Sequence, residues 1–419
     1  MQTTLLHGGH LITDPAALTD DGVITDGGVL VVGEQIEAVG PFDALHKAHP
    51  EATVLGSAHH LVMPGLINAH HPGSGIMAPH FWIRDDYLEP WMPDFLSMPP
   101  LDLYLDTLYA TMRMIRSGVT CVLHMAYPRD WWDTGEESRS TLGAYADSGM
   151  RVAYVMATQD RHTLVYGDDA AFIKTLPPDL AQRVGTLFDE LDDAGGGDYF
   201  ELVEEHREQY VEHSRVRLLL SPSGPEWCSD ELLVQINEAA ERMDTGLHLH
   251  LLESPLERAF AERFYGGSVV EHLDRLGLLR PATSFAHGTW LNEAEIALAA
   301  ERGVTVCHNA SSNLRLRCGI APVGAMIDAG LNVAIGMDSN SLANDENMLG
   351  EMRLVRNLHR LPRGLNFEAL PRRTRCLPHG GPGRCQGNHL RRHYWPAHPR
   401  GGGGRRADRL HGHVRVSCR

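Results

Sequence analysis

Apolar and polar positions follow two different patterns along this chain. Between about residues 64 and 370, eight short apolar runs alternate with stretches of helical periodicity. The eight runs are, in order, GLINAH, GVTCVLHM, RVAYVMAT, VRLLLSP, TGLHLHLLE, TSFAHGT, GVTVCHN and LNVAIGMD. Apolar strands that alternate with helices are typical of a parallel sheet with both faces covered. The pattern therefore predicts an α/β fold, a (β/α)8 TIM-type barrel over residues 64–370.

Two of the helical stretches also have recognisable ends. Ser229 or Asp230 is a suitable N-cap for the stretch SDELLVQINEAAERMD. The stretch NEAEIALAAERG ends in Gly303, a suitable C-cap residue. These ends support the prediction of separate helices between the strands.

The first 63 residues have a different, shorter period. The segment GGVLVVGEQIEAVG alternates apolar and polar residues between glycine pairs, which indicates a strand, a turn and a second strand. Further strand-like sequence follows in ATVLGSAHHLVMPG. Residues 1–63 are therefore predicted to build most of a small β-sandwich domain.

Residues 371–419 continue neither pattern. They contain 12 Arg, nine Gly, six His and five Pro, with Asp408 as the one acidic residue. One interpretation is a disordered basic tail. The other is a translated frameshift, since GC-rich DNA read out of frame gives these residue types. The abrupt change in composition favours the frameshift.

Composition narrows the class of protein. The 419 residues carry 37 basic and 54 acidic side chains, a net charge of −17, which argues against nucleic acid or a membrane surface as partner. No apolar run approaches the roughly 18 residues of a membrane span. The seven Cys residues show no C-x-x-C spacing, which predicts reduced thiols rather than disulfides. The first residues lack the basic and apolar segments of a signal peptide, so we expect the cytoplasm.

Metal-ligand residue types recur where the predicted strands end. Active sites of such barrels lie at the carboxyl ends of the strands, so side chains at these positions converge. The residues concerned are His70 and His71 in the first run, His248, His250 and Glu253 in the fifth, His287 in the sixth, His308 and Asn309 in the seventh, and Asp338 in the eighth. Several imidazoles and carboxylates at one barrel mouth predict a site for zinc or a similar divalent ion.

The same segments resemble a known family. PGLINAH, HLHLLE, FAHGTWL, VCHNASSNLRLRCGIAPV and VAIGMDSNSLANDENMLGEMRL together are similar to the amidohydrolase superfamily, in its cytosine deaminase and chlorohydrolase-like branch. Relatives in that branch include guanine, S-adenosylhomocysteine and pterin deaminases and triazine hydrolases. The resemblance covers about residues 1–370. It implies a cytoplasmic hydrolase that deaminates an aminated N-heterocycle (purine, pterin, pyrimidine or triazine-like) by a metal-bound hydroxide, and it implies a homo-oligomer.

The resemblance also implies roles for individual residues. One divalent ion, zinc in first place and iron as the alternative, would be held by His70, His250, His287 and Asp338. The catalytic residues implied are Glu253 as proton shuttle, His287 beside the attacking water, and Asp338. Lys174 does not lie at a strand end, which argues against a site with two metals bridged by a carboxylated lysine.

One position departs from the family pattern. The first strand of the family carries H-x-H, whereas this chain has Pro72 two residues after His70. Residues i and i+2 share a face of a strand, so His71 does not replace the missing ligand. Two hypotheses therefore stand: an active metal-dependent deaminase, or an inactive or impaired amidohydrolase homologue.

Contacts to the small-molecule substrate are expected from the loops. Trp82 and Arg84 in the long loop after the first run offer groups that stack on a flat ring. Gln159 after the third run and Asn309 after the seventh are further candidates. Ser223 stands in a loop where several relatives carry a substrate-binding His. His124 is another candidate pocket residue, and His248 is expected in the core behind His250.

Overall fold

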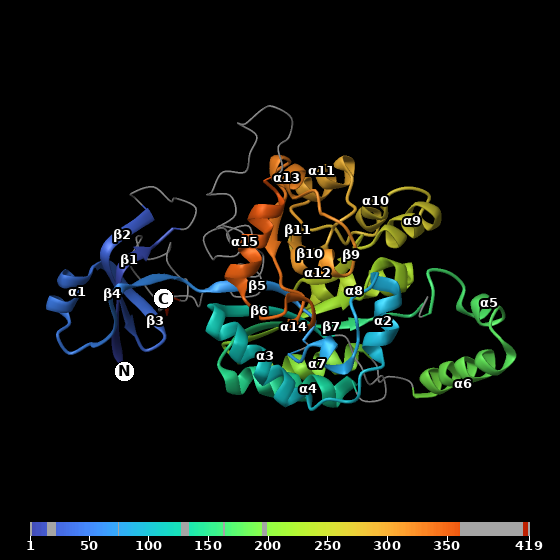
Figure 1. Cartoon of the computed structure of the whole chain (residues 1–419), viewed down its shortest axis with the longest axis horizontal. Coiled ribbons are helices and arrows are strands. Elements are labelled where there is room, and N and C mark those ends of the chain that lie inside the picture. Colours follow the sequence, from blue (N-terminus) through green and yellow to red (C-terminus); the bar gives the residue numbers. More distant parts are fainter. Residues whose placement is uncertain are drawn as a thin grey trace.

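The computed structural model describes residues 2–14, 22–73, 75–126, 134–161, 164–194, 199–360 and 414–417. It contains a large eight-stranded sheet and a separate small sheet. Figure 1 shows the small sheet on one side of the larger unit, with helix α6 projecting on the opposite side. The interpretation of residues 371–419 as a frameshifted tail lies outside the described residues, apart from the strand β13 (Val414–Ser417).

The large sheet is the predicted barrel. Its strands follow one another in chain order and pair in parallel. They are β5 (Leu66–His71), β6 (Val119–Ala126), β7 (Arg151–Thr158), β8 (Val216–Pro222), β9 (Leu247–Leu251), β10 (Thr283–His287), β11 (Thr305–His308) and β12 (Asn332–Ile335). Each strand coincides with one of the eight apolar runs, so the prediction of a (β/α)8 barrel is confirmed.

Helices connect the barrel strands, and most of them lie around the outside of the barrel, whereas α6 projects from it (Figure 1). They are α2 (Leu88–Leu96), α3 (Leu103–Ser117), α4 (Thr134–Ser148), α5 (Asp169–Ile173), α6 (Pro178–Ala194), α7 (Tyr199–Tyr210), α8 (Asp230–Arg242), α9 (Pro255–Phe264), α10 (Val269–Arg275), α11 (Glu293–Glu301), α12 (Ala310–Arg315), α13 (Val323–Asp328), α14 (Asn340–Ala343) and α15 (Met348–Leu358), with the 3-10 turns η2 (Ala78–Phe81) and η3 (Pro225–Trp227). The side chain of Ser229 caps α8 as predicted, by accepting a hydrogen bond from the backbone N–H of Leu232. Gly303 follows the end of α11 with a φ of 74°, the left-handed conformation that suits glycine.

The barrel closes where its first strand meets its last. We call this contact between β5 and β12 the seam. The amide oxygen of Asn68 accepts a hydrogen bond from the Met337 N–H at 3.0 Å. The Asp338 N–H donates to the backbone oxygen of His70 at 3.1 Å. Gly336 allows the close approach, because a Cβ atom there would lie 2.3 Å from Asn309 Oδ1 and 2.8 Å from His70 Cβ.

The small sheet has the order β13-β4-β1-β2-β3. Its other strands are β1 (Thr3–Ile12), β2 (Val23–Val32), β3 (Gln35–Pro41) and β4 (Thr53–Pro64). Helix α1 (Phe42–Ala48) covers one face, where Phe42 and Leu45 pack on Leu5 and Leu30. A small sheet built mainly from the N-terminal segment is thus present, and its described strands form a single layer.

No helix within the described ranges is long and apolar enough to cross a lipid bilayer.

We expect Gly336→Ala to weaken the seam. The added methyl group collides with His70 and Asn309, and such overpacking costs about 1–3 kcal/mol of unfolding free energy. Thermal denaturation measures the effect as a lower Tm. Gly185→Ala in α6 is the matched control, because a Cβ atom there meets nothing within 4 Å. Equal Tm values for Gly336→Ala and the control would contradict the close contact at the seam.

Candidate metal-dependent active site

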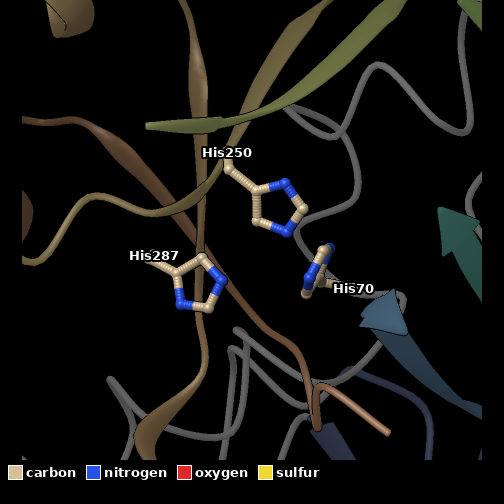
Figure 2. Close-up of side chains that lie close together, drawn as sticks. All are labelled: His70, His250 and His287. Carbon is tan, nitrogen blue, oxygen red and sulfur yellow. The ribbon is translucent and has the colours of Figure 1, made fainter. Parts of the chain in front are cut away.

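Side chains from four parts of the barrel meet at the carboxyl ends of its strands. The imidazoles of His70, His250 and His287 converge from β5, β9 and β10, as Figure 2 shows. Their nearest nitrogen atoms all lie within 4.8 Å of one another. Ligand atoms of Glu253, His287 and Asp338 form a second group with the same spacing. His287 belongs to both groups, so the five side chains make one cluster.

The strand ends turn sharply where the cluster residues stand. His287 has a φ of 71° and Asp338 a φ of 56°, both in the left-handed region that side chains rarely adopt. Ser339 continues this conformation after Asp338, with a φ of 71°. Such strained residues persist only where the surrounding structure holds them, and they are frequent at functional sites. Here the backbone strain coincides with two residues of the cluster.

Asp338 lies between two of the imidazoles. Its Oδ1 is 3.2 Å from His70 Nε2, and its Oδ2 is 3.8 Å from His287 Nε2. The same His287 nitrogen is 3.2 Å from Glu253 Oε2. All of these side chains are almost completely buried. Ring nitrogens and carboxylate oxygens therefore face one another in a small volume.

Each imidazole is oriented through its far nitrogen. His70 Nδ1 lies 2.9 Å from His248 Nε2, and His248 in turn contacts Ser284 Oγ at 2.7 Å. His250 Nδ1 lies 3.1 Å from the backbone oxygen of Ser223. His287 Nδ1 lies 2.8 Å from Asn313 Oδ1. Partners of this kind on the far nitrogen are typical of metal-binding histidines, because they fix the ring and leave the other nitrogen for the ion.

The near nitrogen of His70 is the informative atom. His70 Nε2 is buried and has no hydrogen-bond partner of acceptable geometry, although it points at Asp338. A buried polar atom without a partner is costly unless something else satisfies it. A divalent ion among His70, His250 and His287 would satisfy it.

The charge states suit metal binding. Burial lowers the pKa of His250 to about 3 and that of His287 to about 4, so both rings are neutral at pH 7. Burial opposes ionisation of Asp338, yet His70 and His287 together hold its pKa below the usual range. Neutral imidazoles and an ionised carboxylate are the forms that bind a metal ion.

Glu253 is in a different state. Burial, with a further contribution from the charge of Asp338, raises the pKa of Glu253 well above its usual range. Burial therefore favours the protonated form of this carboxyl group. A protonated carboxyl beside an ionised one gives the site both a proton donor and a proton acceptor.

His71 points away from this cluster. Its Nε2 pairs with Glu346 Oε1 at 2.9 Å, and its Nδ1 accepts a hydrogen bond from the Gly73 N–H at 3.0 Å. Pro72, which lies between His71 and Gly73 in the chain, is half-buried and offers no donor atom. The described cluster is thus built without a side chain from position 72.

The loop residues predicted to bind substrate are placed unequally. Asn309 is fully buried, with its amide nitrogen 3.4 Å from His287 Nε2. Gln159 is half-buried just after β7. Trp82 is 90% exposed and Arg84 is exposed as well. Of the four, the structure brings Asn309 into contact with the cluster.

His124 and His248, the two other histidines named from the sequence, are both fully enclosed. His124 contacts the Tyr145 hydroxyl at 2.9 Å on the side of His71, and burial lowers its pKa well below the usual value. His248 lies directly behind His70 and supports it. The expected position of His248 in the core is therefore what the structure has.

Several residues that orient the cluster were not singled out from the sequence. They are Asn68, Ser284, Asn313 and Cys318. Asn313 and Cys318 lie within the segment VCHNASSNLRLRCGIAPV, whose likeness to a family was visible. Their contacts depend on how the loop after β11 folds back over β10, which periodicity does not show.

The chain is similar in sequence to proteins of a known family. The model of the family described as "Amidohydrolase family" matches residues 61–372, and that of an imidazolonepropionase-like composite domain of bacteria matches residues 27–52. The chain is 30% identical over 315 residues to a 5'-deoxyadenosine deaminase of Methanosarcina barkeri, which covers 74% of this chain and 64% of that protein. It is 31% identical over 333 residues to a 5-methylthioadenosine/S-adenosylhomocysteine deaminase of Nitratidesulfovibrio vulgaris, covering 78% of this chain and 67% of that protein.

A solved structure shows the same architecture. An adenosine deaminase of Xanthomonas campestris with bound zinc superimposes with a TM-score of 0.65 at 25% identity. The match covers 85% of this chain and 73% of that one. The chain thus spans about two thirds of the length of its deaminase relatives, and somewhat more of this solved structure.

We expect the buried His71–Glu346 pair to stabilise the end of β5. His71→Leu or Glu346→Leu alone leaves the partner buried and unpaired, which costs about 3–5 kcal/mol of unfolding free energy. The double variant should lose less than the sum of the two, because no unpaired charge remains. Chemical denaturation of the three variants measures the coupling. Glu204→Gln breaks the exposed pair with Arg207 and should cost less than about 1 kcal/mol. Strictly additive losses would show that the two side chains do not interact.

Proposed function

Because the chain belongs to the amidohydrolase family, we propose that it catalyses the hydrolytic deamination of an aminated N-heterocycle with one divalent metal ion at the barrel mouth. The observation that carries the proposal is the convergence of the imidazoles of His70, His250 and His287, with His70 Nε2 left without a hydrogen-bond partner, beside the carboxyl groups of Asp338 and Glu253. The ion would be held by His70, His250, His287 and Asp338.

The ion supplies one chemical property. A bound divalent cation lowers the pKa of a water molecule that it holds to about 7, so a nucleophile is available at neutral pH. Imidazole and carboxylate ligands suit both zinc and iron. We propose zinc in preference to iron, because the adenosine deaminase of similar fold is described with bound zinc.

The side chains of the cluster divide the proton transfers among them. Asp338 is ionised and accepts the proton that the attacking water loses. Glu253 is protonated and donates to a ring nitrogen, and a proton then passes to the departing amine, which leaves as ammonia. His287, 3.2 Å from Glu253 and 3.8 Å from Asp338, is placed to stabilise negative charge on the attacked centre. The net reaction adds water to the ring carbon and replaces the amino group by oxygen.

The relatives favour an adenine nucleoside as the substrate. Two of them are described as deaminases of 5'-deoxyadenosine and of 5-methylthioadenosine or S-adenosylhomocysteine. Ser223, whose backbone oxygen supports His250, stands where several family members carry a substrate-binding His, so contacts to the ring differ from theirs. We propose that Asn309 contacts the substrate, since it is buried beside His287. Trp82, Arg84 and Gln159 would contact substituents farther from the ring.

Pro72 supports a second candidate, an impaired member of the family. A donor atom is missing at this position, and the loss of even an indirect partner of a metal ligand typically lowers metal affinity 10–100-fold. A chain of this kind would bind the ion weakly and turn over slowly. Metal retention by the purified chain distinguishes the two candidates.

The cysteines bear on the compartment in which the protein acts. Cys228, Cys307 and Cys318 are free thiols in the described part of the chain. Free thiols fit a reducing compartment, and we propose the cytoplasm. We further propose a homo-oligomer, as the family resemblance implies.

We expect Glu253→Gln to abolish most of the activity. An amide cannot donate and accept the transferred proton, so kcat should fall about 10²–10⁴-fold while the bound metal stays in place. The measurement is ammonia release from 5'-deoxyadenosine, 5-methylthioadenosine, adenosine and guanine. Glu204→Gln, an exposed carboxylate on α7, is the control and should behave as the wild type. Full activity of Glu253→Gln would contradict the role of Glu253.

A further inference from the structure

The two carboxyl oxygens of Glu253 have different neighbours. Oε2 lies 3.2 Å from His287 Nε2 and faces the cluster. Oε1 accepts a hydrogen bond from the thiol of Cys318, with Sγ 3.5 Å away. Glu253 and Cys318 are both buried, so water does not compete for either contact. The carboxyl group is therefore held from the side opposite His287.

The loop that carries Cys318 is itself held in place. The Cys318 N–H donates to the backbone oxygen of Asn313 at 2.9 Å. The Cys318 backbone oxygen accepts a hydrogen bond from Trp290 Nε1 at 2.7 Å. Gly319 follows with a φ of 120°, which permits the tight turn. The side chain of Cys318 packs among Leu88 and Trp91 of α2. The thiol consequently has little freedom to leave Glu253.

The same short loop also orients His287. Asn313 binds His287 through its side chain and Cys318 through its backbone. Residues 313–318 thus set the positions of His287, which lies at Glu253 Oε2, and of the Cys318 thiol, which lies at Oε1. Glu253 and His287 are therefore both held by the same short segment.

We propose that Cys318 is a positioning residue that selects the oxygen of Glu253 from which the proton is transferred. In a protonated carboxyl group the carbonyl oxygen is the better acceptor and the other oxygen carries the proton. A thiol that donates to Oε1 therefore favours Oε1 as the carbonyl oxygen and places the proton on Oε2, toward the cluster. In the transfer the Oε2–H bond breaks, the proton bonds to the ring nitrogen, and the carboxylate keeps the electron pair. Cys318 keeps its own proton throughout.

Two further observations support this role. Burial raises the pKa of the Cys318 thiol, so it remains a donor rather than a nucleophile. The backbone oxygen of Leu316 is a more distant acceptor for the same thiol, at 3.7 Å. The inference rests on the proposed function, since it concerns the proton that Glu253 transfers.

A pair of substitutions tests the role in turnover. Cys318→Ala removes the donor and should lower kcat about tenfold, with KM changed less than twofold, because substrate binding does not require the thiol. Cys318→Ser keeps a donor and should recover most of the loss. The control is Cys307→Ala, since Cys307 is a buried thiol that packs on Ala69 and Ala334 and should leave kcat unchanged. Wild-type kcat in Cys318→Ala would overturn the proposal.

An infrared spectrum tests the contact without turnover. The S–H stretching band that is absent from Cys318→Ala identifies the thiol. In Glu253→Ala this band should move to the higher frequency of a weaker hydrogen bond. A band that does not respond to Glu253→Ala would overturn the role of Cys318, whatever the enzyme acts on. A wild-type chain that releases no ammonia from any amino-heterocycle would instead contradict the proposed function, while the band still reports on the contact.

Discussion

Closure of the barrel between β5 and β12 is the constraint on which the candidate site depends. His70 and Asp338 stand on the two strand ends that meet there, and the Asp338 N–H bonds to the backbone of His70 itself. Gly336 permits the approach, and Asn68 fixes its register. A cluster residue from the first strand and one from the end of the last therefore reach each other only because the sheet is closed. The other histidines of the cluster enter from strands whose positions the closed ring dictates.

Within this frame, burial determines the chemistry. It keeps His250 and His287 neutral and raises the pKa of the Glu253 carboxyl group. Asp338 remains ionised because two imidazoles face it. Similar side chains thus acquire opposite roles from their surroundings, as acid–base catalysis requires. Groups behind the cluster, such as Asn313, decide which atoms are presented to a ligand.

Much of the fold could be predicted from the sequence, because strands covered on both faces are apolar along their whole length. The eight barrel strands and the Ser229 cap followed from such local patterns. Resemblance to the family named the cluster residues, and the structure brings them together. Contacts such as that of Cys318 with Glu253 depend on loops whose course is set by tertiary packing, so no local signal shows them. For the same reason the sequence did not show that Trp82 is exposed.

The proposed site holds a divalent ion through His70, His250, His287 and Asp338, without a donor at position 72. Zinc titration of the purified chain, followed by elemental analysis, tests it beside Pro72→His and the matched Pro72→Ala. We expect close to one zinc per chain in the wild type and in Pro72→Ala, with tighter binding in Pro72→His. Zinc bound by Pro72→His alone would contradict it and favour an impaired homologue.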